Sequence, residues 1–316
     1  MKKAKVLLLS AISAMSLLFL GGCNTAKFKV GICQLAQHEA LDAATKGFKD
    51  ALKEELGSQV AFDEQVANGE SATCSTIVNS FVSKKVDLIM ANATPALQAA
   101  FNATDTIPIL GTSITEYGVA LGLENFSGVT EVNVSGTSDL APLKEQATMV
   151  KDLFPDAHKV GLLFCSAEAN SLYQVQVVEQ ELQAKGFTTE RIAFSDSNDM
   201  AVTLTAKAPS LDVLYVPTDN TCADNATTID AICETNHLPV FAGEENLCKK
   251  CGVVTLSISY YNIGLKTGKM AAEILKGEKK VSEMPIAYDE NPVKKFNRTI
   301  CERLGMTPPS GYEEIK

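Results

Sequence analysis

The chain has 316 residues, of which 46% are hydrophobic and 21% are charged, and its formal net charge is −10 at pH 7. The hydrophobic content excludes a disordered chain, and the length leaves room for two domains of ordinary size. The negative charge argues against a nucleic-acid-binding protein, because affinity for nucleic acid comes from cationic contacts to phosphate.

The chain begins with a positively charged, apolar segment that ends at a cysteine. Three lysines among the first five residues precede an apolar run from Val6 to Leu20, and two glycines lead to Cys23. This layout is typical of a secretory signal peptide, here residues 1–22. A transmembrane anchor is the weaker alternative, because this apolar run is shorter than the roughly 20 consecutive apolar residues that a span needs. The last residues resemble the lipobox of bacterial lipoproteins, which predicts a lipidated Cys23 and a linker over residues 23–27.

From Lys29 onward, short apolar strands alternate with amphipathic helices. Lys29 to Cys33 (KVGIC) predicts a buried strand, and apolar residues from Leu41 to Leu56 then recur at helical spacing. Thr94 is the expected N-cap of a later helix, with Pro95 at its first position. The expected strands of this first half are 29–33, 60–62, 86–91 and 107–110, separated by helices over 41–56, 74–82 and from 94 onward.

The same order of elements returns in the second half. Lys159 to Phe164 (KVGLLF) matches KVGIC, and Leu211 to Val216 (LDVLYV) matches the earlier VDLIMA. Further strands are expected at 188–194, 238–242 and 253–258, with helices at 171–185 and 261–276. The repeat predicts an α/β protein with two Rossmann-like lobes, each built on a parallel sheet with right-handed crossovers.

The tail of the chain is expected to join the two lobes by a hinge of three chain crossings. The helix over 261–276 would pack on the first lobe, and the residues after it would return to the second. The expected N-terminal lobe is therefore 28–132 plus 258–284, and the expected C-terminal lobe is 133–257 plus 285–316.

Polar and small residues follow the strands at the edge where a ligand would bind. In open parallel sheets, ligands bind beyond the carboxyl ends of the strands. Two facing lobes would bring these loops to one cleft. The candidates are Gln34, Thr94, Pro95, Ser113 and Thr115 in the first lobe, and Ser166, Glu168, Asn170, Ser171, Asp219, Asn220, Thr221 and Glu244 in the second.

The chemistry of this set suits an amino acid. Helix starts at Thr94-Pro95 and Asn170-Ser171 would present backbone N–H groups to a carboxylate. Asp219 would offer a negative charge to an ammonium group. Each feature has a structural alternative: a hydroxyl at a helix start is commonly only a cap, and Asp219 could hold its own loop. His38 is more often a helix-start residue than a ligand contact. Tyr260 and Tyr261 could line the mouth of the cleft or pack the last helix, and packing is the favoured role.

The cysteines and the catalytic motifs indicate neither a cofactor nor an enzyme. Cys248 and Cys251 form the one tight pair among nine cysteines, but no second pair or nearby histidine completes a zinc site. In an exported protein, the eight cysteines after Cys23 could form disulfides or remain buried thiols. The sequence contains no Gly-x-Ser-x-Gly or His-Glu-x-x-His motif, so no catalytic residue, metal or other cofactor is expected.

The chain as a whole resembles the substrate-binding lipoproteins of ABC importers, which have the type I periplasmic-binding-protein fold. It is most similar to the family that includes tryptophan and other aromatic amino-acid binding proteins. The matching stretches are VGICQLAQHEALDAATKGF, VDLIMANATPALQAA, FCSAEANSLYQVQ and VPTDNTCAD. The resemblance implies that Thr94, with Asn170 and Ser171, holds a ligand carboxylate and that Asp219 holds the ammonium group. It also implies that Gln34 and Leu35 lie near the ligand.

The expected function is that of a monomeric, extracytoplasmic solute-binding protein. It would capture an aromatic or large apolar amino acid and deliver it to an ABC permease, held at the outer face of the membrane by the lipid at Cys23. One alternative is a sensor lipoprotein for another small solute, such as a sugar, a nucleoside or a peptide. A secreted enzyme is a further alternative with less support. The lack of tryptophan counts mildly against a sugar, because sugar clefts commonly stack rings on aromatic side chains.

Overall fold

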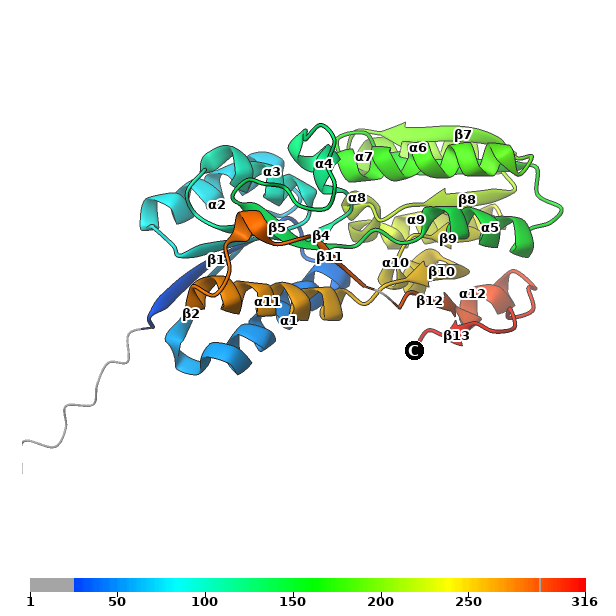
Figure 1. Cartoon of the computed structure of the whole chain (residues 1–316). Helices are drawn as coiled ribbons and strands as arrows, with labels where there is room; N and C mark the ends of the chain where they lie inside the picture. Colours follow the sequence, from blue (N-terminus) through cyan, green and yellow to red (C-terminus); the bar gives the residue numbers. More distant parts are fainter. Residues whose placement is uncertain (1–25, 290) are drawn as a thin grey trace, which may run out of the picture.

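The computed structural model describes residues 26–289 and 291–316, so the expected signal peptide and Cys23 lie outside the described residues. Two sheets, one in each lobe, organise these residues (Figure 1). The first sheet contains β1 (Phe28–Gln34), β2 (Val60–Val66), β3 (Leu88–Asn92), β4 (Ile109–Ile114), β5 (Val134–Ser138) and β11 (Ala287–Tyr288). The second contains β6 (Lys159–Cys165), β7 (Thr188–Phe194), β8 (Val213–Val216), β9 (Val240–Ala242), β10 (Val254–Ser257), β12 (Val293–Phe296) and β13 (Glu313–Glu314).

Both sheets are dominated by parallel pairs. The strand order is β11-β5-β4-β3-β1-β2 in the first sheet and β13-β12-β10-β9-β8-β6-β7 in the second. The one antiparallel pair among the described strands is β10 with β12. The predicted α/β class with two parallel lobes is therefore confirmed.

Helices cover both faces of the first sheet. α1 (Glu39–Leu56) and α11 (Tyr260–Lys276) pack on one face, and α2 (Ser71–Lys84) and α3 (Thr94–Ala103) on the other, with the short α4 (Tyr117–Leu121) beyond α3. Successive residues of β1 face opposite sides: Ile32 joins the cluster under α1, whereas Cys33 joins the cluster under α2. This burial on both faces explains the continuous apolar runs of the central strands.

The second lobe is built in the same way. α5 (Leu143–Leu153), α6 (Ala169–Ala184) and α12 (Arg298–Arg303) pack on one face of its sheet. α7 (Ser197–Lys207), α8 (Asn220–Asp224), α9 (Ala226–Thr235) and α10 (Glu245–Cys251) pack on the other. Three short 3-10 helices complete the described elements, namely η1 (Gly57–Gln59), η2 (Ala208–Ser210) and η3 (Val281–Glu283).

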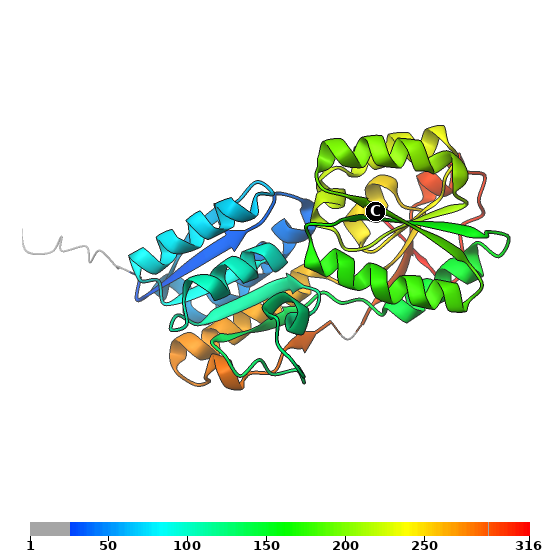
Figure 2. The same cartoon turned by 90° about the horizontal axis from the view of Figure 1, so that it is seen from above.

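The chain passes between the lobes three times, between β5 and α5, between β10 and α11, and between β11 and β12. Figure 2 shows the result: the orange α11 lies with the N-terminal lobe, and the red C-terminal segment lies with the other. The expected lobe boundaries differ from this arrangement. Residues 133–138 and 285–288 were expected in the C-terminal lobe, but β5 pairs with β4 and β11 pairs with β5, so both strands belong to the first sheet.

Small residues explain why the sequence pattern does not predict a strand at β5. Its sequence, VSGTS, has no apolar run, although all five residues are buried. Gly136 has a φ of +141°, and a Cβ there would lie 2.0 Å from the carbonyl oxygen of Gly111 on β4. Close approach of the two backbones, rather than packing of large side chains, therefore places this strand.

The start of α3 also differs from the expectation. Ala93, not Thr94, occupies the N-cap position, with a left-handed φ of +87°. Its N–H donates to the carbonyl oxygen of Thr112 on β4 at 3.1 Å, so the turn is held by the neighbouring strand rather than by a side-chain cap. A non-glycine residue in this region is strained, and such strain concentrates at functional sites.

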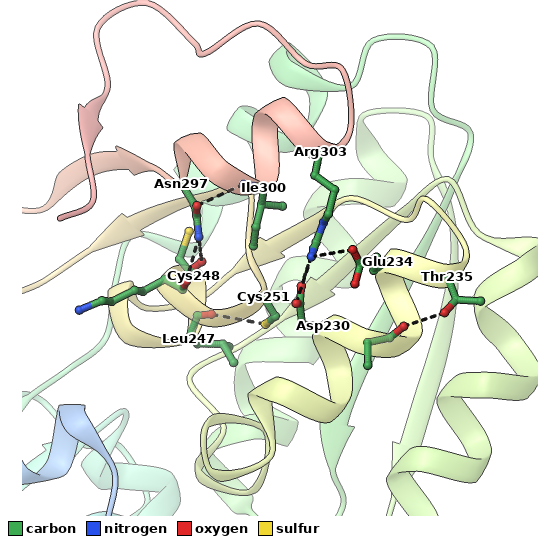
Figure 3. A network of polar contacts seen from close by, with 11 residues as sticks. Asp230, Glu234, Thr235, Leu247, Cys248, Cys251, Asn297, Ile300 and Arg303 are labelled. Carbon is green, nitrogen blue, oxygen red and sulfur yellow. Dashed lines mark hydrogen bonds and ion pairs between the residues drawn. The ribbon is translucent and has the colours of Figure 1, made fainter.

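The C-terminal segment is tied to the second lobe by polar contacts around α12 (Figure 3). The Asn297 side chain donates to the carbonyl oxygens of Cys248 at 3.1 Å and Lys249 at 2.9 Å, at the end of α10. Arg303 forms a two-pronged ion pair with Asp230 of α9. The tail therefore stabilises the lobe that carries α8, α9 and α10.

The cysteines lie in the cores of the lobes. Each of the eight cysteines in the described part of the chain is a buried free thiol. Burial raises the pKa of Cys222, Cys248 and Cys251 well above the usual value, which keeps these thiols protonated and unreactive. Within residues 26–289 and 291–316, no helix has both the length and the apolar character needed to cross a membrane.

Candidate ligand-binding site

A small pocket with a cavity volume of about 20 Å³, or about 300 Å³ when the empty space up to its open mouth is counted, lies between the lobes at the carboxyl ends of the strands. Three carboxyl groups line it, and no lysine or arginine does. The lining residues are His38, Ala40, Leu41, Ser113, Asp139 and Tyr260 from the first lobe, and Asn170, Thr218, Asp219, Asn220, Ala223 and Glu244 from the second. Because both lobes contribute, closure of the lobes assembles the site.

Asp219 follows β8 and is the N-cap of α8. One carboxylate oxygen accepts from the N–H of Cys222 at 2.8 Å, and the other accepts from the N–H of Cys165 at 2.7 Å. Burial, followed by the nearby charge of Glu168, raises its pKa to about 7, against the opposing effect of these hydrogen bonds. A cation in the pocket would favour the ionised form.

Two further carboxyl groups share this environment. Glu244 is the N-cap of α10 and accepts from the N–H groups of Asn246 and Leu247; burial raises its pKa to about 7. Asp139, just beyond β5, accepts from the hydroxyls of Thr115 and Tyr260, both at 2.9 Å. Burial raises the pKa of Asp139 as well. The pocket is therefore suited to a ligand with a positively charged group.

Two buried polar atoms of the pocket residues have no protein partner. One is the Ser113 hydroxyl oxygen in the first lobe, and the other is the Asn170 side-chain oxygen in the second. A buried polar group without a partner costs about 1–3 kcal/mol. Ser113 also has a left-handed φ of +56°. Unpaired polar atoms and backbone strain at one site are features of a binding site.

The Asn170 side chain is held so that its oxygen, not its nitrogen, remains free. Its NH₂ group donates to Glu168 at 3.2 Å, to the Ser171 hydroxyl at 3.3 Å and to the carbonyl oxygen of Thr218 at 3.1 Å. A free acceptor suits an ammonium group better than a carboxylate.

Glu168 organises the loops around the pocket. Its two carboxylate oxygens accept from the backbone N–H and side-chain groups of Asn220 and from the backbone N–H and hydroxyl of Thr221, at 2.7–3.0 Å. The amide oxygen of Asn220 does not bind Glu168. It lies 3.4 Å from Nε2 of His38 in the other lobe.

A second, wider cavity adjoins the pocket and also lies between the lobes. Leu35 and Pro95 line it from the first lobe, and Glu168 and Thr221 from the second. Asn220 lines both cavities. Nine of the predicted site residues thus line the cleft in its two parts, with Ser113, Asn170, Asp219, Asn220 and Glu244 at the pocket itself.

The remaining predicted residues lie away from the cavity walls. Gln34 is bound within the first lobe to Thr45, Asp42 and the carbonyl oxygen of Ala36. Thr94 is buried at the start of α3, and Thr115 holds Asp139. The Ser166 hydroxyl donates to Phe194, and Ser171 lies between Asn170 and Asp219. These residues support the site from behind.

Seven of the residues that line the pocket were not among the predicted site residues, and three of these, Asp139, Tyr260 and His38, carry titratable side chains. Asp139 was not predicted because no strand was expected at residues 134–138, which the expected boundaries placed in the other lobe; the signal that was available is an acid directly after that segment. Tyr260 packs α11, as favoured, and its hydroxyl also binds Asp139. His38 starts α1, as favoured, but also faces Asn220 across the cleft.

The model of the ABC transporter substrate binding protein family matches residues 29–311. A protein of Clostridioides difficile (strain R20291) named tyrosine-binding protein is 34% identical over 283 residues, which are 88% of this chain and 81% of that protein.

Two solved structures differ in their degree of similarity. The ABC domain of Streptococcus pneumoniae in complex with L-Trp is 29% identical, covers 92% of this chain and 100% of its own, and has a TM-score of 0.88. The ligand-free, open structure of CD0873 of Clostridium difficile, a substrate binding protein with adhesive properties, is 36% identical, with coverages of 92% and 99%, and a TM-score of 0.69. The arrangement of the lobes is therefore nearer to the ligand-bound protein than to the open one.

Proposed function

The chain belongs to the family of ABC transporter substrate-binding proteins, and from this premise we propose that it captures an aromatic L-amino acid between its lobes. The observation that carries the proposal is the pair of unpartnered buried atoms, Ser113 Oγ and Asn170 Oδ1, which line one pocket from opposite lobes beside Asp219. A zwitterion offers both a donor and an acceptor to such a pair.

Each group of the amino acid has a matching partner. We assign the ammonium group to Asp219 and Asn170, because both present acceptors in a buried setting. The Ser113 hydroxyl can donate to the carboxylate. The pocket is too small for an aromatic ring as well, so the side chain would extend into the wider cavity beside Leu35 and Pro95. Tyrosine and tryptophan, which the two relatives are named for or bind, are the first candidates.

Calorimetric titration of the purified protein with each of the twenty amino acids tests this function. We expect binding of at least one of L-tyrosine, L-tryptophan and L-phenylalanine. A glucose and a uridine titration serve as controls for the sugar and nucleoside alternatives. Binding of a sugar or nucleoside, with none of any aromatic or large apolar amino acid, would remove the proposed ligand class.

Affinity should depend on pH through the buried carboxyl groups. In the free protein the pKa of Asp219 is raised to about 7, so the carboxyl is protonated below pH 7, whereas the ligand ammonium group binds the ionised form. Binding is then favoured above the free-state pKa and weakens as pH falls through it. We expect about a tenfold rise in Kd between pH 8 and pH 6 for one carboxyl group that must ionise. A Kd that is constant, or lower at pH 6, would contradict the assignment.

We further propose that the protein acts without catalysis, as a monomer, and passes its ligand to a membrane permease. The relatives are substrate-binding proteins rather than enzymes, which supports this reading. Residues 1–22 would be removed, and a lipid on Cys23 would hold the lobes at the extracytoplasmic face of the membrane, with several acyl chains needed for stable retention.

Cys23→Ala tests the anchor separately from the binding site. We expect the variant to be released into the soluble fraction, because no lipid can be attached, with ligand affinity unchanged. Fractionation followed by immunoblotting measures the release, and Cys33→Ala is the control for loss of a cysteine as such. Retention of Cys23→Ala in the membrane would show that another segment holds the protein there.

A further inference from the structure

We propose that His38 and Asn220 form a latch that holds the two lobes closed, and that Glu168 positions this latch together with the ligand pocket. The latch concerns lobe closure, and its role in retaining a ligand rests on the proposed function. His38 stands at the start of α1 in the first lobe, and Asn220 stands at the start of α8 in the second.

The contact between His38 and Asn220 connects the two lobes. His38 Nε2 lies 3.4 Å from Asn220 Oδ1. Among residues 26–289 and 291–316, this is the only side-chain hydrogen bond that joins the two lobes across the cleft. His38 occupies the N-cap position of α1, but its side chain makes no cap hydrogen bond, so the imidazole is available for this contact.

The orientation of Asn220 is determined by Glu168. The side-chain nitrogen of Asn220 donates to Glu168 Oε2 at 2.7 Å, and its backbone N–H donates to the same oxygen at 3.0 Å. A carboxylate oxygen in such contacts accepts, so the amide nitrogen must face Glu168 and the amide oxygen must face His38. The imidazole therefore donates through Nε2–H. Burial lowers the pKa of His38, which favours the neutral ring in the closed arrangement.

The same carboxylate connects the latch to the pocket. Glu168 Oε2 also accepts from the side-chain nitrogen of Asn170, whose oxygen is the unpartnered acceptor in the pocket. One atom thus orders a group that faces the ligand and a group that faces the opposite lobe. Glu168 is not among the residues that line the pocket, and we describe it as a positioning residue.

This arrangement predicts a kinetic role. A ligand contact contributes to affinity in any closed state, whereas a latch slows reopening. A side-chain hydrogen bond contributes about 1 kcal/mol net, which corresponds to about a fivefold change in a rate. We therefore expect loss of the latch to appear mainly as faster dissociation of the ligand.

A double-mutant cycle tests the latch. Dissociation rates of L-tyrosine and L-tryptophan are measured by stopped-flow for the wild type, His38→Ala, Asn220→Ala and the double variant. We expect His38→Ala to dissociate about fivefold faster, and the double variant to dissociate no faster than Asn220→Ala. The Asn220–Glu168 contact is lost in both Asn220 variants, so it cancels from the cycle. Exposed His158→Ala is the control and should match the wild type.

Hydrogen exchange tests the latch by a measurement that does not depend on the class of ligand. Backbone amide exchange over residues 38–44 and 220–226 is measured without ligand and with saturating L-tyrosine or L-tryptophan. The latch predicts faster exchange in both segments for each single variant, with no further increase in the double variant. The latch would be overturned if the effects of the two substitutions on exchange were additive. It would also be overturned if exchange in the variants equalled that of the wild type both without and with ligand. If calorimetry shows no aromatic amino acid bound to the wild type, the proposed function fails. Hydrogen exchange measured without ligand still decides whether the latch exists.

Discussion

Asp219→Asn is expected to raise the Kd for the amino acid at least 100-fold. The substitution keeps the size of the side chain but removes the charge that we pair with the ligand ammonium group. Losing one partner of a buried charge pair costs about 3 kcal/mol, which is about 100-fold in Kd. Calorimetric titration at pH 8, where the wild-type carboxyl is mostly ionised, measures the effect.

The matched control for this variant is Asp212→Asn. Asp212 accepts from the N–H groups of His158 and Lys159 at the start of β6, as Asp219 accepts from Cys165 at the end of the same strand. Both substitutions remove a carboxylate that binds this strand, but only Asp219 lies in the cleft. We expect Asp212→Asn to lower thermal stability without changing Kd more than about twofold, as is usual for a change remote from the site. An Asp219→Asn variant with wild-type affinity would refute the assigned role.

Gly264→Ala is expected to have the largest effect on stability. α1 and α11 pack side by side under the first sheet (Figure 1), and glycines allow their backbones to approach closely. A Cβ at Gly264 would lie 2.1 Å from the carbonyl oxygen of Ala44, and one at Gly47 would lie 2.2 Å from that of Tyr261. The helices must therefore move apart to admit a methyl group.

The two effects of this substitution oppose each other, and the clash is larger. Alanine favours a helix interior over glycine by about 1 kcal/mol. Overpacking against a backbone atom that cannot rotate away costs about 3 kcal/mol or more. We expect the Tm of the first lobe to fall by about 5–10 °C in a calorimetric scan. Lys269→Ala, at an exposed position of the same helix, is the control and should leave the Tm within about 2 °C. An unchanged Tm for Gly264→Ala would mean that the helices are not closely packed.

The glycine contact between α11 and α1 also shows what the spacing of apolar residues does not predict. The helix was expected to pack through its large apolar residues. Ile263 and Met270 are indeed buried, but Gly264 and Gly268 make the close approach to α1. A glycine carries no hydrophobic signal, so the partner helix and the helix separation could not be predicted from the spacing of apolar residues.

The sequence by itself determined the properties that depend on local pattern. Alternation of apolar runs with amphipathic helices predicted two α/β lobes, and the parallel topology placed Asp219, Asn170 and Ser113 at facing edges of the sheets. These predictions succeed because a strand buried on both faces and a helix buried on one have characteristic periods within a few residues.

Only the tertiary structure decided the membership of β5 and β11, the entry of Asp139 into the pocket and the orientation of the Asn170 amide. Each depends on contacts between residues far apart in the chain, such as the pairing of β5 with β4 or the hold of Glu168 on Asn170 and Asn220. Backbone pairing of small residues leaves no hydrophobic period, and a side-chain hydrogen bond depends on the direction of single atoms. Neither is encoded in the local spacing of residues, so both emerge only when the lobes are assembled.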